Sequence, residues 1–155
     1  MCKLFDHEFM ANQEKLLFIL NYIENNITCD ILHLSFGITR CDYLQELHDI
    51  CARISKKGTC IVSAYDNSGA VSYPACFNNV IGIDSFLSYT GYKYQYIENS
   101  IINIRLNIGL KRYRINNKQF IFSGSSFSAA YITGLLSCHM QKGFYTNCHD
   151  ILRKH

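Results

Sequence analysis

Apolar residues recur with a helical period in two stretches of the first half of the chain. Over residues 16–23, leucine and isoleucine lie at positions i, i+3, i+4 and i+7, which places them on one face of a helix. Asn12 is suited to cap the start of this helix. A second helix is predicted from the apolar face of residues 44–54, and Gly58 suits the position that follows a helix end.

Short apolar runs without a helical period lie between and after these helices. Residues 31–34, 59–64 and 80–83 are continuous apolar stretches, typical of strands buried on both faces. Other strand-like runs are residues 2–5, 101–106 and 120–122, and a last helix is expected from about Ser126 through residue 136. The alternation of strands and helices predicts an α/β fold with a three-layer architecture, a parallel sheet covered by helices on both faces. At 155 residues, the chain 1–155 is the size of one domain.

Composition and charge narrow the class of protein. With 48% hydrophobic and 17% charged residues, the chain is expected to be globular. The net charge of +3 is too small to indicate nucleic acid or a membrane surface as a partner, and no apolar run is long enough to span a membrane. A local basic run at Lys111, Arg112, Arg114 and Lys118 is interpreted as a solvated edge between strands.

The eight cysteines predict neither a disulfide framework nor a metal site. They form no C-x-x-C pair, and several lie in apolar runs where a free thiol packs as a small hydrophobe. The pairs Cys138-His139 and Cys148-His149 fit no zinc-binding spacing, so no metal and no cofactor is expected. With no signal peptide evident, the default expectation is a reducing, cytoplasmic compartment.

A cluster of four serines between residues 123 and 128 precedes the last predicted helix. At a helix N-terminus the backbone N–H groups are unpaired and the helix dipole favours negative charge. A serine hydroxyl could attack a carbonyl there, because the developing charge would be stabilised. Serine is equally favoured at helix starts as a simple cap, so the cluster alone leaves both interpretations open.

Four sequence blocks, in order, resemble the subtilisin-like serine peptidases (subtilases). Residues 124–134 (GSSFSAAYITG) resemble the family's G-T-S-M-A-x-P-x-V-A-G block around the nucleophile. Residues 58–69 (GTCIVSAYDNSG) are similar to G-V-V-V-V-A-A-A-G-N-E-G, and residues 72–83 to the Y-P-A…V-I-A-V stretch. Residues 30–37 (DILHLSFG) resemble D-V-I-N-M-S-L-G. The resemblance implies the nucleophile-bearing part of a subtilase catalytic domain, incomplete on its N-terminal side.

The resemblance also implies roles for particular residues. Ser126 would be the nucleophile, and Asn67 would donate a hydrogen bond to the oxyanion. Residues expected to contact a peptide or protein substrate are Ser35, Phe36 and Gly37, which would pair with its backbone, and Ala64, Tyr65, Asp66 and Ser72, which would shape a side-chain pocket. The chain departs from the family pattern at Ala130, which replaces a proline, and at Asp66, which replaces a glycine. A carboxylate at position 66 would oppose an oxyanion unless it is turned away.

The aspartate and histidine of the triad are missing, because neither the D-[ST]-G nor the H-G-T block of the family occurs in this sequence. His7, His33 and His48 are not followed by the Gly-Thr pair, and His33 is interpreted as an interior or cleft-wall residue. One hypothesis is a serine endopeptidase fragment, nearly inactive alone, that needs an upstream segment or a separate chain to supply both residues. The alternatives are a catalytically dead, protease-derived peptide-binding module and an unrelated doubly wound α/β domain whose serines only cap a helix.

Overall fold

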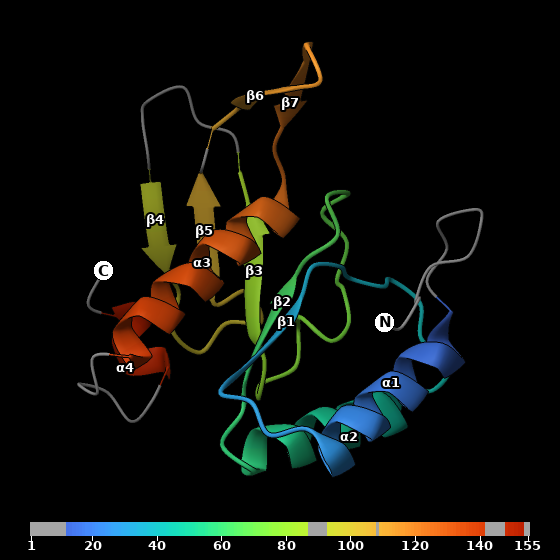
Figure 1. Ribbon diagram of the computed structural model, residues 1–155. Coiled ribbons are helices and arrows are strands. Elements are labelled where there is room, and N and C mark those ends of the chain that lie inside the picture. Colours follow the sequence, from blue (N-terminus) through green and yellow to red (C-terminus); the bar gives the residue numbers. More distant parts are fainter. Residues whose placement is uncertain (1–11, 87–92, 108, 142–147, 154–155) are drawn as a thin grey trace.

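The computed structural model describes residues 12–86, 93–107, 109–141 and 148–153 (Figure 1). Five strands form one sheet in the order β1-β2-β3-β5-β4, and two more form a separate hairpin. The strands are β1 (Ile31–Leu34), β2 (Cys60–Ala64), β3 (Ile81–Ser85), β4 (Lys93–Tyr96), β5 (Ile104–Asn107), β6 (Lys111–Ile115) and β7 (Lys118–Phe122). The helices are α1 (Gln13–Asn26), α2 (Leu44–Lys56), α3 (Ser125–Met140) and α4 (Cys148–Arg153).

Helices cover both faces of the sheet, so the predicted three-layer α/β architecture is confirmed (Figure 1). On one face, α1 and α2 pack over a core that includes Leu20, Leu47 and Ile61. On the other face, α3 and α4 pack over a second core that includes Val62 and Leu136. Neighbouring residues of β2 therefore enter opposite cores, which explains why the strand is a continuous apolar run.

The sheet is mixed and not wholly parallel, which corrects the sequence prediction. Strands β1, β2, β3 and β5 run parallel, whereas β4 pairs antiparallel with β5. Only residues 97–103 join β4 to β5. A parallel connection needs a crossover of a dozen or more residues, so this short link permits only the antiparallel pairing.

Most predicted elements are found at the expected places. The Asn12 side chain caps α1 by accepting a hydrogen bond from the Lys15 N–H (2.8 Å), and Gly58 adopts a left-handed φ of +94° just after α2. Strand β1 matches residues 31–34 but lies at the sheet edge, where three of its four residues are only half-buried. The strand predicted at residues 2–5 lies outside the described residues. No helix in the described part of the chain is long and apolar enough to cross a membrane.

Two glycines provide opposite tests of the packing. A Cβ at Gly82 would lie 2.3 Å from the Ala75 carbonyl oxygen and 2.8 Å from the Tyr65 ring. We therefore expect Gly82→Ala to lower the free energy of unfolding by about 1–3 kcal/mol or more. Gly134, in α3, has open space around it, so Gly134→Ala should raise that free energy by about 0.5–1 kcal/mol. Urea unfolding followed by circular dichroism measures both, and a Gly82→Ala variant as stable as the parent would contradict the packing of β3.

Candidate active site

Three segments distant in the sequence meet where β1 and β2 end. Ser35 follows β1, Asn67 lies in the loop after β2, and α3 begins at Ser125. The Ser126 hydroxyl donates a hydrogen bond to the Ser35 carbonyl oxygen (2.8 Å). The Ser125 backbone N–H donates to the Asn67 side-chain oxygen Oδ1 (3.0 Å). The carboxyl ends of parallel strands are the usual place for a site in such sheets, and the serine cluster lies there.

The hydrogen bond from Ser125 fixes the orientation of the Asn67 amide. A backbone N–H can only donate, so it must face Oδ1 and leave the Asn67 Nδ2 group pointing away. The Ser125 hydroxyl, itself buried, also contacts Asn67 Oδ1 (3.2 Å) and donates to the Tyr65 carbonyl oxygen. The Ser126 N–H lies in the first turn of α3, where helix N–H groups have no intrahelical acceptor. The exposed Asn67 amide and the Ser126 N–H thus each present a donor that is not used in these contacts.

Gly124 permits the close approach of α3 to Asn67. Its φ is +109°, in the left-handed region that favours glycine. A Cβ at this position would lie 2.8 Å from Asn67 Oδ1. Any side chain at position 124 would therefore disturb the Asn67 amide that Ser125 holds.

The Asp66 carboxylate is engaged by its own loop. Its oxygen Oδ1 accepts a hydrogen bond from the Ser68 N–H (2.6 Å), and the Asp66 N–H donates to the Ser72 hydroxyl (2.9 Å). Ser72 is fully buried and donates in turn to the Ala70 carbonyl oxygen (3.1 Å). The carboxylate that could oppose an oxyanion is therefore partly compensated by a backbone donor.

The other residues predicted to contact a substrate lie at the same edge of the sheet, but several have buried side chains. Ala64 and Tyr65 are buried, and the Tyr65 hydroxyl donates to the Ile101 carbonyl oxygen (2.6 Å). The Phe36 carbonyl accepts from Ser63 (3.3 Å), and a Cβ at Gly37 would lie 2.9 Å from the Ala64 carbonyl oxygen. Because these segments pack tightly against one another, their buried side chains have little surface that a substrate could contact. The substrate-contacting role of the segments stays a prediction.

The described histidines on the sheet and α2 do not reach Ser126. His33 Nδ1 pairs with the Thr133 hydroxyl (2.9 Å), seven positions after Ser126 in α3 and so about 10 Å further along the helix axis. His48 lies on α2, on the opposite face of the sheet, with its ring 5.1 Å from that of Phe77. His33 is thus the half-buried interior residue that the sequence indicated, and neither side chain is placed to take a proton from Ser126.

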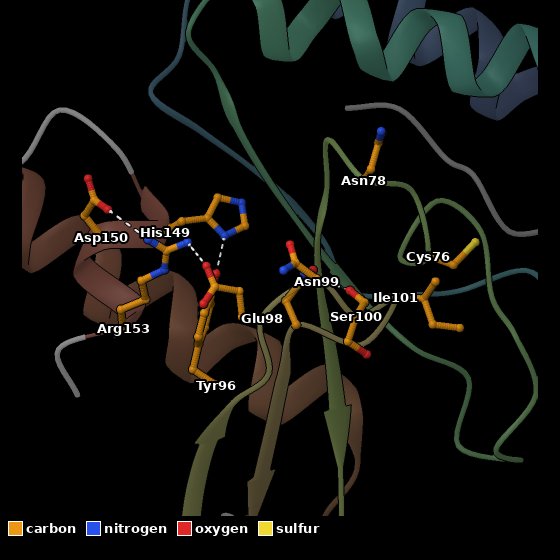
Figure 2. Close-up of a pocket in the computed structure, with 11 residues that line it drawn as sticks. Cys76, Asn78, Tyr96, Glu98, Asn99, Ser100, Ile101, His149, Asp150 and Arg153 are labelled. Carbon is orange, nitrogen blue, oxygen red and sulfur yellow. Dashed lines mark hydrogen bonds and ion pairs between the residues drawn. The ribbon is translucent and has the colours of Figure 1, made fainter.

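The two remaining described histidines lie farther away. His139 contacts the Leu135 carbonyl oxygen (2.9 Å) near the other end of α3. His149 lines a cavity of about 550 Å³ beside Tyr96, Glu98 and Arg153 (Figure 2). That cavity lies where β3 and β5 begin, whereas Ser126 lies at the other end of the sheet, where β1 and β2 end. The described residues hold no group of three or more His, Cys, Asp or Glu side chains placed to bind a metal ion.

The environment of His33 predicts a pH dependence of stability. Burial lowers the pKa of His33 below its ordinary value of 6.5. The unfolded chain therefore binds a proton here more readily than the folded chain, so stability is complete above about pH 6.5 and falls as the pH drops through the folded pKa. We expect His33→Gln, which keeps a hydrogen-bonding group for Thr133, to reduce this loss. Urea midpoints at pH 7.5 and 5.5 measure it, and an equal loss in both proteins would contradict it.

The fold is that of the subtilisin-like proteases. Sphericase matches with a TM-score of 0.72 and 16% sequence identity, over 98% of this chain and 57% of that chain. The psychrophilic subtilisin-like protease Apa1 from the Antarctic psychrotroph Pseudoalteromonas sp. AS-11 matches with a TM-score of 0.50 and 16% identity, over 76% of this chain and 30% of that chain. This chain thus spans little more than half the length of sphericase. No protein-family model and no curated protein sequence matches it.

Sequence comparison with the family blocks assigned roles to Ser126 and Asn67, which stay predictions, and assigned none to Ser125. That residue replaces the threonine of the family block, and the structure uses both its N–H and its hydroxyl to hold Asn67 and the Tyr65 carbonyl. The sequence feature that could have indicated this role is a hydroxyl residue directly before the expected nucleophile. The pairing of His33 with Thr133 joins residues one hundred positions apart, so no local sequence pattern could predict it.

Proposed function

We propose that this chain is the nucleophile-bearing part of a serine-type endopeptidase and acts on peptide or protein substrates. The observation that supports it most is the meeting of Ser126, Asn67 and Ser35 at the carboxyl ends of β1 and β2. A helix cap alone would not require Asn67, 58 positions before Ser125, to be held by that residue's N–H and hydroxyl. The subtilisin-like fold agrees with this proposal.

In the proposed reaction, the Ser126 hydroxyl oxygen attacks the carbonyl carbon of a peptide bond while its proton passes to a histidine. Asn67 Nδ2 and the Ser126 N–H donate hydrogen bonds to the carbonyl oxygen as it becomes negative. The tetrahedral intermediate collapses, the C–N bond breaks, and the histidine returns the proton to the departing amine. Water then hydrolyses the acyl-serine ester, and no metal or cofactor is needed.

The histidine and its aspartate would come from an upstream segment or a separate chain. Strand β1 lies at the edge of the sheet, and the backbone on its outer side pairs with no other described strand. The unpaired N–H and C=O groups of an edge strand can bind a further strand. Parallel sheets are normally buried, so a strand with an exposed edge, such as β1, is expected to have a neighbour there. We propose that the added segment pairs with β1 and carries the missing aspartate and histidine toward Ser126. Without it, activity should be lower by about 10⁶-fold, the scale measured when subtilisin loses its histidine.

A catalytically inactive peptide-binding module is the second candidate. It is favoured by the lack of a histidine near Ser126 among the described residues and by the engagement of the Ser126 hydroxyl with the Ser35 carbonyl. Such a module would bind an extended peptide at the same sheet edge and leave it intact.

The experiment compares the chain alone with the chain co-expressed with the segment encoded directly upstream of Met1, here called the complemented chain. Hydrolysis of fluorescently labelled casein is the readout. We expect cleavage by the complemented chain only, abolished when the upstream histidine is replaced by alanine. Strong cleavage by the chain alone would contradict the proposed need for a partner segment. An upstream frame without aspartate and histidine would leave a separate chain as their source, and tight casein binding without cleavage would favour the binding module.

A further inference from the structure

Charge is unevenly distributed along this chain. Between Glu98 and Asp150 the sequence contains no aspartate or glutamate, although it contains six lysines and arginines. Four of these six lie in the hairpin β6–β7, namely Lys111, Arg112, Arg114 and Lys118. The modest net charge of +3 for the whole chain therefore conceals one strongly cationic element.

The hairpin is exposed and also rich in apolar side chains. Every residue of β6 and four of the five residues of β7 are exposed. The exposed fractions include 51% for Tyr113, 40% for Phe120 and 62% for Ile121. In Figure 1 the hairpin projects beyond the sheet, at the end opposite to α1 and α2. Apolar side chains gathered on an element that contributes to neither core are typical of an interaction surface.

The aromatic rings share one face of the hairpin. Cross-strand partners and alternate residues of a strand lie on the same face, and Tyr113 pairs with Phe120. Ring centroids are 5.6 Å apart for Tyr113 and Phe122, 6.1 Å for Phe120 and Phe122, and 5.1 Å for Phe122 and Phe127 of α3. The same register places Lys111 and Lys118 on this face, beside Phe122 and Ile115. We call these six β6–β7 positions, with Phe127, the aromatic–lysine face: Lys111, Tyr113, Ile115, Lys118, Phe120, Phe122 and Phe127.

We propose that the aromatic–lysine face binds an extended polypeptide segment that carries both carboxylate and apolar side chains. The two lysines complement carboxylates, and the row of rings with Ile115 complements apolar side chains. The hairpin is a two-stranded sheet, so the outer backbone edge of each strand is unpaired among the described residues. A polypeptide can add to such an edge as a further strand through main-chain hydrogen bonds.

The geometry favours a polypeptide over a single-stranded nucleic acid. Bases need open ring faces on which to stack, together with a cationic groove that follows the phosphates. Here Phe120 and Phe122 already stack on each other at 17°, and Phe122 packs against Phe127. The outer edges offer peptide N–H and C=O groups, for which a nucleic acid backbone has no matching ladder. The proposal does not depend on Ser126 being a nucleophile.

The test is fluorescence anisotropy with a labelled ten-residue peptide of alternating aspartate and leucine, and with the same peptide containing asparagine in place of aspartate. The full chain is used as the Ser126→Ala variant, so that binding is measured without cleavage. We expect the aspartate peptide to bind more tightly than the asparagine peptide. Its affinity should fall as the salt concentration is raised, because salt screens the charges. The double variant K111E/K118E should weaken binding by about tenfold or more.

A matched control is K15E/K56E, which reverses two exposed lysines on α1 and α2 and should leave the affinity unchanged. The variant Y113A/F120A tests the contribution of the aromatic rings and should weaken the binding of both peptides. Circular dichroism of every variant confirms that the sheet is intact. Equal affinity for the two peptides, or no loss in K111E/K118E, would overturn the proposal. Tighter binding of an oligothymidine or of phosphatidylserine vesicles than of the aspartate peptide would also overturn it.

Discussion

The complemented chain is expected to lose essentially all peptidase activity when Ser126 is replaced by alanine, with a fall in kcat of about 10⁶-fold. In the proposed reaction the acyl intermediate forms on the Ser126 hydroxyl oxygen, so no neighbouring serine is expected to replace it. Removing the hydroxyl also removes the hydrogen bond to the Ser35 carbonyl, which lies in a partly exposed position and contributes little to stability. The measurement is kcat for a peptide substrate, with urea unfolding to confirm that the fold is retained.

The neighbouring serines are the matched controls for this prediction. Ser123 is exposed, and Ser123→Ala should leave kcat within about threefold. Ser128 is buried and its hydroxyl lies 3.4 Å from the Leu106 carbonyl oxygen, so Ser128→Ala should change stability more than kcat. Activity that survives in Ser126→Ala but disappears in Ser123→Ala or Ser128→Ala would assign the nucleophile to a different residue.

The second large effect is expected for Asn67→Asp, which should lower kcat of the complemented chain by about 10²–10³-fold or more. The aspartate keeps an oxygen where Oδ1 accepts the Ser125 N–H, so the loop and the start of α3 retain their positions. It replaces the Nδ2 donor by a second oxygen with negative charge, which repels the oxyanion. The loss should appear in kcat with little change in KM, because the donor acts on charge that develops only in the transition state.

Ser125→Ala provides the comparison for Asn67→Asp. It removes the hydroxyl contacts to Asn67 and to the Tyr65 carbonyl but keeps the backbone N–H that orients the amide. We therefore expect a smaller loss in kcat, together with lower stability, because the Tyr65 carbonyl loses a buried donor. A loss in Ser125→Ala as large as that in Asn67→Asp would indicate that Asn67 acts through structure and not as a donor.

The order of helices and strands could be predicted because their signals are local. Helices α1 and α2 each bury one face, and the helical spacing of their apolar residues shows this directly. Strands β1, β2 and β3 are short apolar runs with few polar interruptions, typical of parallel strands between two layers. The alternation of these elements was sufficient to predict the layers.

Other parts of the fold could not be predicted because their structure depends on distant partners. Helix α4 has only six residues, too few for a periodic pattern, and it is held by contacts such as the hydrogen bond from the Tyr94 hydroxyl to the Leu152 carbonyl (2.7 Å). Strand β4 alternates lysine, tyrosine and glutamine, and its antiparallel direction follows from the short link to β5. Of hairpin β6–β7, the sequence indicated only a strand at residues 120–122, because β6 is exposed and contributes to neither core. The turn at Asn116-Asn117, whose φ angles are both positive, joins the two strands.

The candidate site was partly predictable for the same reason. Ser126 and Asn67 lie in sequence blocks that can be compared with a family, whereas the partners that hold them come from the tertiary structure. The sequence left open whether the Asp66 carboxylate faces solvent or the oxyanion, and the structure shows it bonded to the Ser68 N–H. The sequence indicated His33 as an interior or cleft-wall residue, and only its tertiary contact with Thr133 places it away from Ser126.

The most direct test of the account is to locate the adduct of a fluorophosphonate probe by mass spectrometry of proteolytic peptides. The probe reacts with a serine whose hydroxyl is activated by a base and whose oxyanion is stabilised. One adduct is expected, on Ser126, formed rapidly in the complemented chain and very slowly in the chain alone, and reduced in Asn67→Asp. An adduct on Ser123, Ser125 or Ser128, or no adduct in a complemented chain that contains an aspartate and a histidine, would contradict the assignment of Ser126 as the nucleophile.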